Sequence, residues 1–155
     1  MATSDPRNTP ASVEKLITDI KAAALKGRGT FTGTVDGKDF TAAAVGLQLV
    51  GSLPKPYLQF IGRAESATGG ELVAIQIYDD AEGLTHELGS EESPAWAHYF
   101  HEPFGYFYAR NGEVSFDLKP TPNHVKGKIE GNFQHNNEPP RAVKCEFDIW
   151  ETLDN

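Results

Sequence analysis

Apolar residues recur at every second position through most of this chain, and this alternation limits the fold more than any other feature. Phe31, Gly33 and Val35 alternate with threonines, and the same period of two returns over residues 125–133 and 143–149. A period of two is typical of strands that bury one face and expose the other. One-sided burial is common in antiparallel sheets, whereas parallel sheets are buried on both faces. The pattern therefore predicts an antiparallel sheet.

Turn signals divide this pattern into eight or nine short strands. Asp36-Gly37 and Asn111-Gly112 are typical of tight hairpin turns, and residues 84–88 read as a short edge strand. Residues 89–103 are the least regular stretch, so we expect a loop there. No connection between strands is long enough for a crossover helix. We expect a mainly β fold, either an antiparallel β-sandwich or a flattened barrel, because the sequence does not give the strand pairing.

The start of the chain has a different period. Apolar residues between positions 12 and 26 follow helical spacing and form one stripe, which consists of Val13, Leu16, Ile17, Ile20 and Ala24. A lone helix of this length is marginal in water, so the stripe should pack on the sheet or across one end of it. We expect a mobile tail over 1–11 and one domain over 12–155, with the helix at 12–26 and the β portion at 28–151.

Charge is distributed unevenly along the chain. The protein has 22 acidic and 14 basic residues, a formal charge of −8, which argues against nucleic acid as a partner. Residues 64–109 contain no Lys or Arg, but they contain nine acidic residues: Glu65, Glu71, Asp79, Asp80, Glu82, Glu87, Glu91, Glu92 and Glu102. We interpret this acidic block as a solvated face. A docking patch for a basic partner and a weak divalent-cation site are the alternatives.

Several features bear on the compartment. No apolar run approaches the roughly 20 residues of a membrane helix, so we expect no transmembrane segment. The first ten residues have no apolar signal region, and a single cysteine rules out an intramolecular disulfide. A cytoplasmic location is expected, with signal-independent export or a processed mature chain left open. Cys145 alternates with the inward residues and is predicted to be an inert core thiol.

Three segments resemble a known group of domains. Residues 29–42 read GTFTGTVDGKDFTA, residues 108–116 read YARNGEVSF, and residues 125–129 read VKGKI. The first is similar to the F-x-A-x-V-x-G-K-x-F-x-A opening hairpin of uncharacterised bacterial β-sandwich domains of the lipoprotein type, and the others resemble their later hairpin and strand. The resemblance implies a β-sandwich fold and no particular activity.

Residues 96–108 hold the richest set of functional side chains. We predict an aromatic loop there that forms a ligand-binding surface, because Trp and Tyr offer apolar area with a polar tip. Its candidate residues are Trp96, Tyr99, Phe100, Phe104, Tyr106 and Tyr108. The alternatives are simple aromatic packing and a divalent-metal site at His98, His101 and Glu102. The metal site needs a helical turn, because on a strand residues three apart point to opposite faces.

Catalytic motifs are absent from the sequence. There is no G-x-S-x-G, no phosphate-binding loop and no H-E-x-x-H. We therefore expect a non-enzymatic binding or interaction domain that recognises a protein, a glycan or a lipid surface. A toxin- or lectin-type protein that recognises membranes or glycans is the first alternative, and a metal-dependent hydrolase at His98, His101 and Glu102 is the second. Open sheet edges and the apolar helix stripe would favour a homo-oligomer.

Overall fold

Ten strands account for most of the chain that the computed structural model describes, which is residues 27–50, 56–66, 69–101, 105–120, 123–135 and 138–151. They are β1 (Gly27–Val35), β2 (Lys38–Thr41), β3 (Ala44–Val50), β4 (Tyr57–Ser66), β5 (Gly69–Tyr78), β6 (Thr85–Glu87), β7 (Ala95–His101), β8 (Gly105–Pro120), β9 (Asn123–Gln134) and β10 (Arg141–Glu151). The predicted tail at 1–11 and the predicted helix at 12–26 lie outside the described residues.

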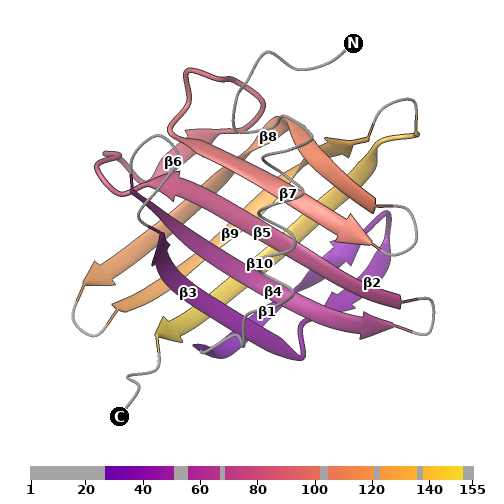
Figure 1. The fold of residues 1–155 in the computed structure, drawn as a ribbon, viewed down its shortest axis with the longest axis horizontal. Helices are drawn as coiled ribbons and strands as arrows, with labels where there is room; N and C mark the ends of the chain where they lie inside the picture. Colours follow the sequence, from indigo (N-terminus) through magenta and orange to yellow (C-terminus); the bar gives the residue numbers. More distant parts are fainter. Residues whose placement is uncertain are drawn as a thin grey trace.

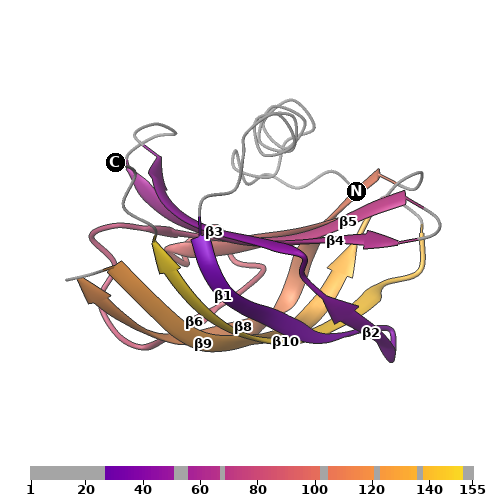
Figure 2. The same ribbon diagram turned by 90° about the horizontal axis from the view of Figure 1, so that it is seen from below.

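All the strands join one sheet, and every strand pair is antiparallel, as the sequence predicted. Its order is β2-β1-β10-β9-β8-β7-β5-β4-β3, and β6 pairs with the second half of β8. The sheet is strongly curled into a half-barrel. Figure 2 shows β3, β4 and β5 passing over β1, β9 and β10, and Figure 1 shows the two layers crossing at an angle. The curl gives the sheet a concave inner face and a convex outer face.

The two edges of the sheet meet at the link between β2 and β3. Ala42 donates a backbone hydrogen bond of 3.0 Å to Phe31 on β1, and Ala43 donates one of 2.7 Å to Arg63 on β4. The chain therefore leaves β1 and joins β4 within two residues. Gly27 also lies close to β3, since a Cβ built there would be 2.8 Å from the carbonyl oxygen of Val45. Connectivity thus brings the first and last strands of the order together.

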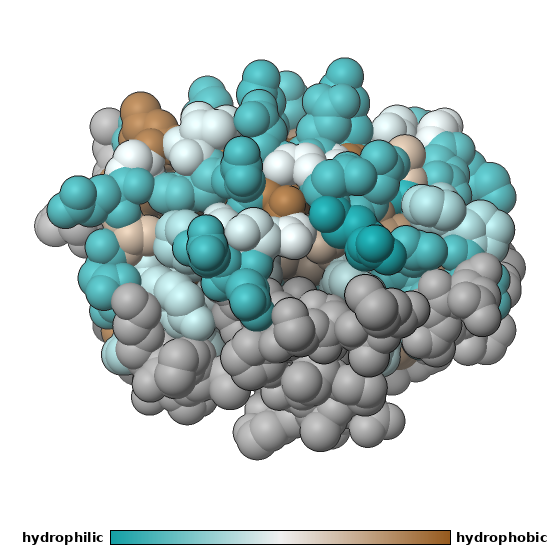
Figure 3. Space-filling model, turned by 90° about the horizontal axis from the view of Figure 1, so that it is seen from above, coloured by the Kyte–Doolittle hydropathy of each residue, from teal (hydrophilic) through white to brown (hydrophobic). Residues whose placement is uncertain are grey.

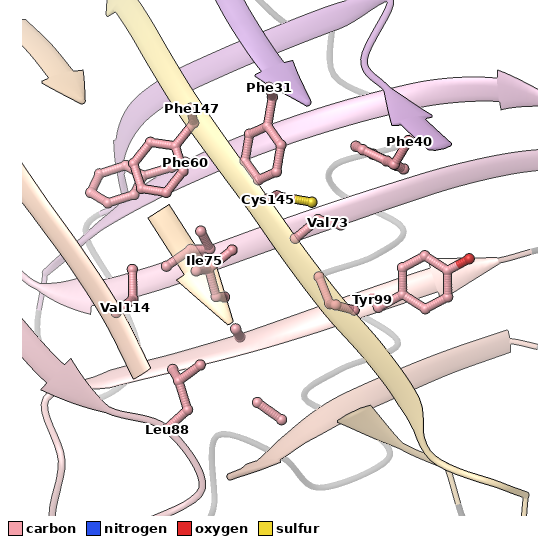
Figure 4. Packing of buried hydrophobic residues seen from close by; sticks show 14 of the residues in the cluster. Phe31, Phe40, Phe60, Val73, Ile75, Leu88, Tyr99, Val114, Cys145 and Phe147 are labelled. Carbon is pink, nitrogen blue, oxygen red and sulfur yellow. The ribbon is translucent and has the colours of Figure 1, made fainter. Parts of the chain in front are cut away.

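Aromatic side chains fill the inner face. Phe31 and Phe147 stack with ring centroids 5.5 Å apart, and Phe60 lies 5.7 Å from Phe147. Figure 4 shows these rings grouped with Val73, Ile75 and Cys145. Cys145 is buried, as predicted. Gly62 faces this group from β4, and an added Cβ would lie 2.5 Å from Cγ of Phe31. Only glycine allows such a close approach between β4 and the Phe31 ring.

The outer face has two different halves. On β1, β8, β9 and β10 most outward positions are polar. Figure 3 shows a largely hydrophilic surface over the described residues on one side of the molecule. On β4, β5 and β7 the outward residues are buried as well, so the prediction of one wet face is wrong for these three strands. Leu72 to Ile77 is buried at every position. Strands buried on both faces lose the alternation that marks the others.

One predicted hairpin turn and one predicted loop are also wrong. Asn111-Gly112 is no hairpin turn, because β8 runs through it with a bulge between Ala109 and Asn111. Gly112 has a φ of 116°, and a Cβ there would lie 2.1 Å from the carbonyl oxygen of Glu130. The glycine serves strand packing at the bulge. The predicted loop at 89–103 includes β7, whereas the predicted edge strand at 84–88 is confirmed as β6.

Helices that could cross a membrane do not occur among the residues that the structure describes.

Candidate functional site

The aromatic segment 96–108 forms two paired strands, β7 and the start of β8. Its side chains therefore divide between the two faces of the sheet. Tyr99 and Phe107 pair in register and point to the inner face. The outward positions hold Trp96, Phe100, Tyr106 and Tyr108, and Phe104 lies outside the described residues. The prediction of an aromatic loop is wrong, because the described part of the segment forms strands, and Tyr99 points to the opposite face from the other described candidates.

Burial divides these aromatic residues further. Trp96 is 3% exposed and Tyr99 is 2% exposed, so neither ring is available as a flat contact surface. Trp96 lies between Tyr57 and Tyr78, with centroid distances of 5.3 and 5.0 Å. Phe100 and Tyr106 are partly buried against a small outer-face cluster of Ile61, Leu72 and Ala74.

His98 and His101 are not brought together. Both lie on β7 three positions apart, and so they fall on opposite faces of the strand. His98 is fully buried on the outer side, and His101 shares the inner side with Tyr99. Glu102 lies outside the described residues. Within the described ranges no group of three or more His, Cys, Asp or Glu side chains could hold a metal ion.

Charged, histidine and aromatic side chains instead lie together at one end of the half-barrel. This is the end with the β1–β2, β4–β5, β7–β8 and β9–β10 connections. A chain of contacts links seven residues there, which we call the end cluster: Asp36, Glu71, Tyr99, His101, Phe107, His135 and Arg141. Only Tyr99 and His101 come from the predicted segment's candidate residues.

Glu71 and Tyr99 form the centre of the end cluster. The Tyr99 hydroxyl donates a hydrogen bond of 2.6 Å to Oε2 of Glu71. Glu71 is also directly opposite His101 in the register of β5 and β7. Burial raises the pKa of Tyr99 well above its usual value, and the hydrogen bond and negative charge of Glu71 raise it further. Tyr99 therefore stays neutral at physiological pH and acts as a hydrogen-bond donor.

Arg141 and Asp36 form the charged rim of the end cluster. Nη1 of Arg141 lies 3.4 Å from Oδ2 of Asp36, and its guanidinium lies 5.2 Å from the centre of the Phe107 ring. Asp36 has a φ of 51° in the β1–β2 turn. Its Oδ1 accepts a hydrogen bond of 2.7 Å from the amide of Ala142, which ties the turn to β10. Both side chains are partly exposed to solvent.

His135 completes the end cluster beside β8. Its ring lies 5.1 Å from that of Tyr106 and 5.7 Å from that of Phe107. Sequence reasoning missed His135, Glu71, Asp36 and Arg141 as site residues. No local spacing relates them, because Asp36 and Arg141 alone are 105 positions apart. Strand pairing is what brings them together.

Two grooves on the outer face offer a second set of polar groups. The first, of about 650 Å³, crosses β8, β9, β10 and β1 and is lined by Lys126, Lys128, Glu146 and Asp148 among others. The second, of about 860 Å³, includes Glu87, Glu113 and Glu130, which are directly opposite one another on β6, β8 and β9. The charges in the first groove alternate in sign across the strands, as in an ordinary solvated sheet face.

An aromatic stack borders the first groove. The rings of His124 and Trp150 are parallel and 3.7 Å apart, and the Arg28 guanidinium lies 5.2 Å from the Trp150 ring. His124 also pairs with Asp148 through Nε2. The Trp150 ring therefore already has protein contacts from both neighbouring strands, β9 and β1.

Comparisons of the chain with family models, curated proteins and solved structures gave no significant match. The resemblance of residues 29–42 to bacterial lipoprotein-type domains stays a prediction. Function must therefore be argued from the arrangement of the residues themselves.

Proposed function

We propose that this protein is a non-enzymatic binding domain that recognises a cationic group, an amine or a guanidine, at the end cluster. Glu71 is the anchor of this site. The inner face is packed with buried apolar side chains, so a ligand would bind at the end of the half-barrel instead of inside it.

The observation that carries the proposal is the environment of the Glu71 carboxylate. Tyr99 donates to Oε2, whereas a carboxylate can accept about four hydrogen bonds in all. His101 lies directly opposite Glu71 in the strand register, and its ring centroid is 6.1 Å from that of Tyr99. A carboxylate with acceptor capacity left suits a cation, because a charge-assisted hydrogen bond from an ammonium or guanidinium group is stronger than a hydrogen bond between neutral groups.

The local charges favour a cation over an anion. Arg141 already contacts Asp36 and the Phe107 ring, so the end cluster contains two carboxylates and one engaged guanidinium. Glu71 belongs to the acidic block of residues 64–109, which adds long-range attraction for positive charge. The sequence left open a docking patch for a basic partner as an alternative role of the acidic block. A site at the end cluster is a narrower form of that alternative, with Glu71 as the single anchoring residue.

Chemical considerations support binding more than catalysis. The raised pKa of Tyr99 makes this hydroxyl a poor base and a poor nucleophile. Cys145 is buried, and burial raises its pKa to about 12, which suppresses the reactive thiolate. The other sequence hypotheses gain no comparable support, because Trp96 and Tyr99 are buried and His98 is on the opposite face from His101.

A titration with a dibasic peptide tests the proposal. Acetyl-Arg-Arg-amide is added to the isotopically labelled protein at low salt, and amide shifts are followed by NMR. We expect saturable shifts around Glu71, His101 and His135, and at least a tenfold loss of affinity in Glu71→Gln. Glu138→Gln is the matched control, because it removes the same charge from an exposed loop residue.

Three results would overturn the proposal. One is an equal loss of affinity in Glu71→Gln and Glu138→Gln, which would mean that only the overall charge attracts the peptide. Another is unchanged binding in Glu71→Gln. Shifts confined to the outer grooves would also refute a site at the end cluster.

A further inference from the structure

Eight residues on the outer side of β4, β5 and β7 are buried even though they point away from the inner face. We call them the covered face: Tyr57, Gln59, Ile61, Leu72, Ala74, Gln76, Trp96 and His98, none of which is more than 5% exposed. We propose that residues 12–26 form an amphipathic helix that lies across the covered face, with its apolar stripe against the sheet.

The covered face requires a layer above it. Its residues are separated from the main core by the sheet itself, and three of them form a distinct cluster of Ile61, Leu72 and Ala74. Figure 2 shows no described strand on the outer side of β4 and β5. Side chains on the outside of a sheet reach near-zero exposure only where another element packs on them.

The register of the strands gives the middle of this face a row that includes two small residues. Gly46, Ile61, Ala74 and His98 are directly opposite one another on β3, β4, β5 and β7. The row continues to Tyr108 on β8. Gly46 at its first position and Ala74 at its centre, between the larger side chains of the adjacent rows, leave room for a helix that crosses the strands.

The chain reaches this row immediately after the predicted helix ends. Gly27 follows Lys26, and a Cβ at Gly27 would lie 2.8 Å from the carbonyl oxygen of Val45 and 3.1 Å from Cα of Gly46. Gly46 is in turn opposite Ile61. A helix that ends at residue 26 therefore ends beside the first strand of the row.

The lengths also agree. A helix over residues 12–26 is about 22 Å long at about 1.5 Å per residue. Strands β3, β4, β5, β7 and β8 are successive neighbours, so the row across them spans about 19 Å at about 4.8 Å per step. The stripe of Val13, Leu16, Ile17, Ile20 and Ala24 would lie along that row, with Ala24 near β4 and Val13 near β8.

Thiol accessibility tests the helix and its orientation with a matched pair of variants. Ala24→Cys lies in the stripe, and Ala22→Cys lies on the opposite side of the same helix. Cys145 is buried and gives a silent background. We expect Ala24→Cys in the folded protein to react at least tenfold more slowly than Ala22→Cys with a maleimide reagent, and both to react equally in urea. Equal rates in the folded protein would overturn the proposal.

Disulfide trapping tests the occupant of the covered face. Ile20→Cys combined with Ala74→Cys should form a disulfide within one chain on mild oxidation, whereas Thr18→Cys with Ala74→Cys should not. A disulfide-linked dimer from the first pair would show that a second copy covers the face, which refutes the proposal. Failure of both pairs to cross-link in a folded protein would refute it too.

Discussion

The hydroxyl of Tyr99 donates a hydrogen bond of 2.6 Å to Oε2 of Glu71, and this bond joins β7 to β5 where the apolar inner face ends. Figure 4 shows the Tyr99 ring within the core and its oxygen turned away from the phenylalanines. The ring is thus part of the core, and the hydroxyl is part of the end cluster. One side chain holds the proposed anchor in place and closes the hydrophobic interior.

Removing this hydroxyl should cost stability. We expect Tyr99→Phe to lower the free energy of unfolding by about 1 to 3 kcal/mol, because hydrogen bonds to charged groups contribute about that much. Urea unfolding measures the change. Tyr108→Phe on the outer side of β8 serves as the control and should change stability by less than about 0.5 kcal/mol. Equal effects of the two substitutions would show that the Glu71 bond contributes nothing of its own.

The buried Gln59–Gln76 pair should behave as a coupled unit. Nε2 of Gln76 donates a hydrogen bond of 2.9 Å to Oε1 of Gln59, and Oε1 of Gln76 has no hydrogen-bond partner among the described residues. Gln76→Leu alone leaves the Gln59 oxygen without its donor and should cost about 1 to 3 kcal/mol. The double variant Gln59→Leu/Gln76→Leu should recover most of that loss. A double-mutant cycle of unfolding free energies checks this, and strict additivity would contradict it.

The row of three glutamates should be a source of local repulsion. Glu113 lies directly opposite Glu87 on one side and Glu130 on the other. Like charges in such pairs are destabilising, so Glu113→Gln should raise stability by about 0.2 to 1 kcal/mol at low salt. The gain should shrink at 1 M salt, where charges are screened. Glu138→Gln removes the same charge from an exposed loop and should give no comparable gain in stability. An equal gain in that variant would mean that the overall charge of the protein, and not the row of glutamates, causes the effect.

Cys145 should make stability depend on alkaline pH. Burial raises its pKa from 9.0 in the unfolded chain to about 12 in the folded protein. The folded state then keeps a thiol proton that the unfolded state loses above pH 9. The contribution of Cys145 to the free energy of unfolding is therefore complete below pH 9 and is lost as the pH rises towards 12. Cys145→Ala should be less stable than the parent at pH 8, and this deficit should narrow by about 1.4 kcal/mol at pH 10. A constant deficit from pH 8 to 10 would contradict the assigned cause.

The sequence predicted most of the β structure because its signals are local. The alternation around Phe31 and the Asp36-Gly37 turn each involve neighbouring residues, and both are confirmed. The strand over residues 72–77 was also recognisable in the sequence, but the burial of its outer face was not. Outward Gln59 and Gln76 look like surface residues in the sequence, and only strand register shows that they share a buried layer.

The site was much less predictable. Residues 96–108 were singled out for their composition, and the prediction of a loop failed because residues 89–94 look irregular while 95–101 form a strand. Gly112 misled in the same way, since a glycine beside an asparagine looks the same in a hairpin turn and at a bulge. Asp36, Glu71 and Arg141 are separate in the sequence, and only the pairing of β1, β5, β7 and β10 brings them together.

The two-residue link between β2 and β3 limits what shapes the sheet can take. These strands are at opposite ends of the strand order, yet Ala42 and Ala43 are all that separates them. The three Cα–Cα steps from Thr41 to Ala44 span at most about 11 Å, whereas nine strands side by side in a flat sheet would be about 38 Å across. The covalent chain therefore acts as a clasp, and the sheet cannot uncurl while its strands stay paired. Flattening the sheet would therefore require breaking strand pairs beside this link, even though neither β2 nor β3 has a strand partner on its outer edge among the described residues.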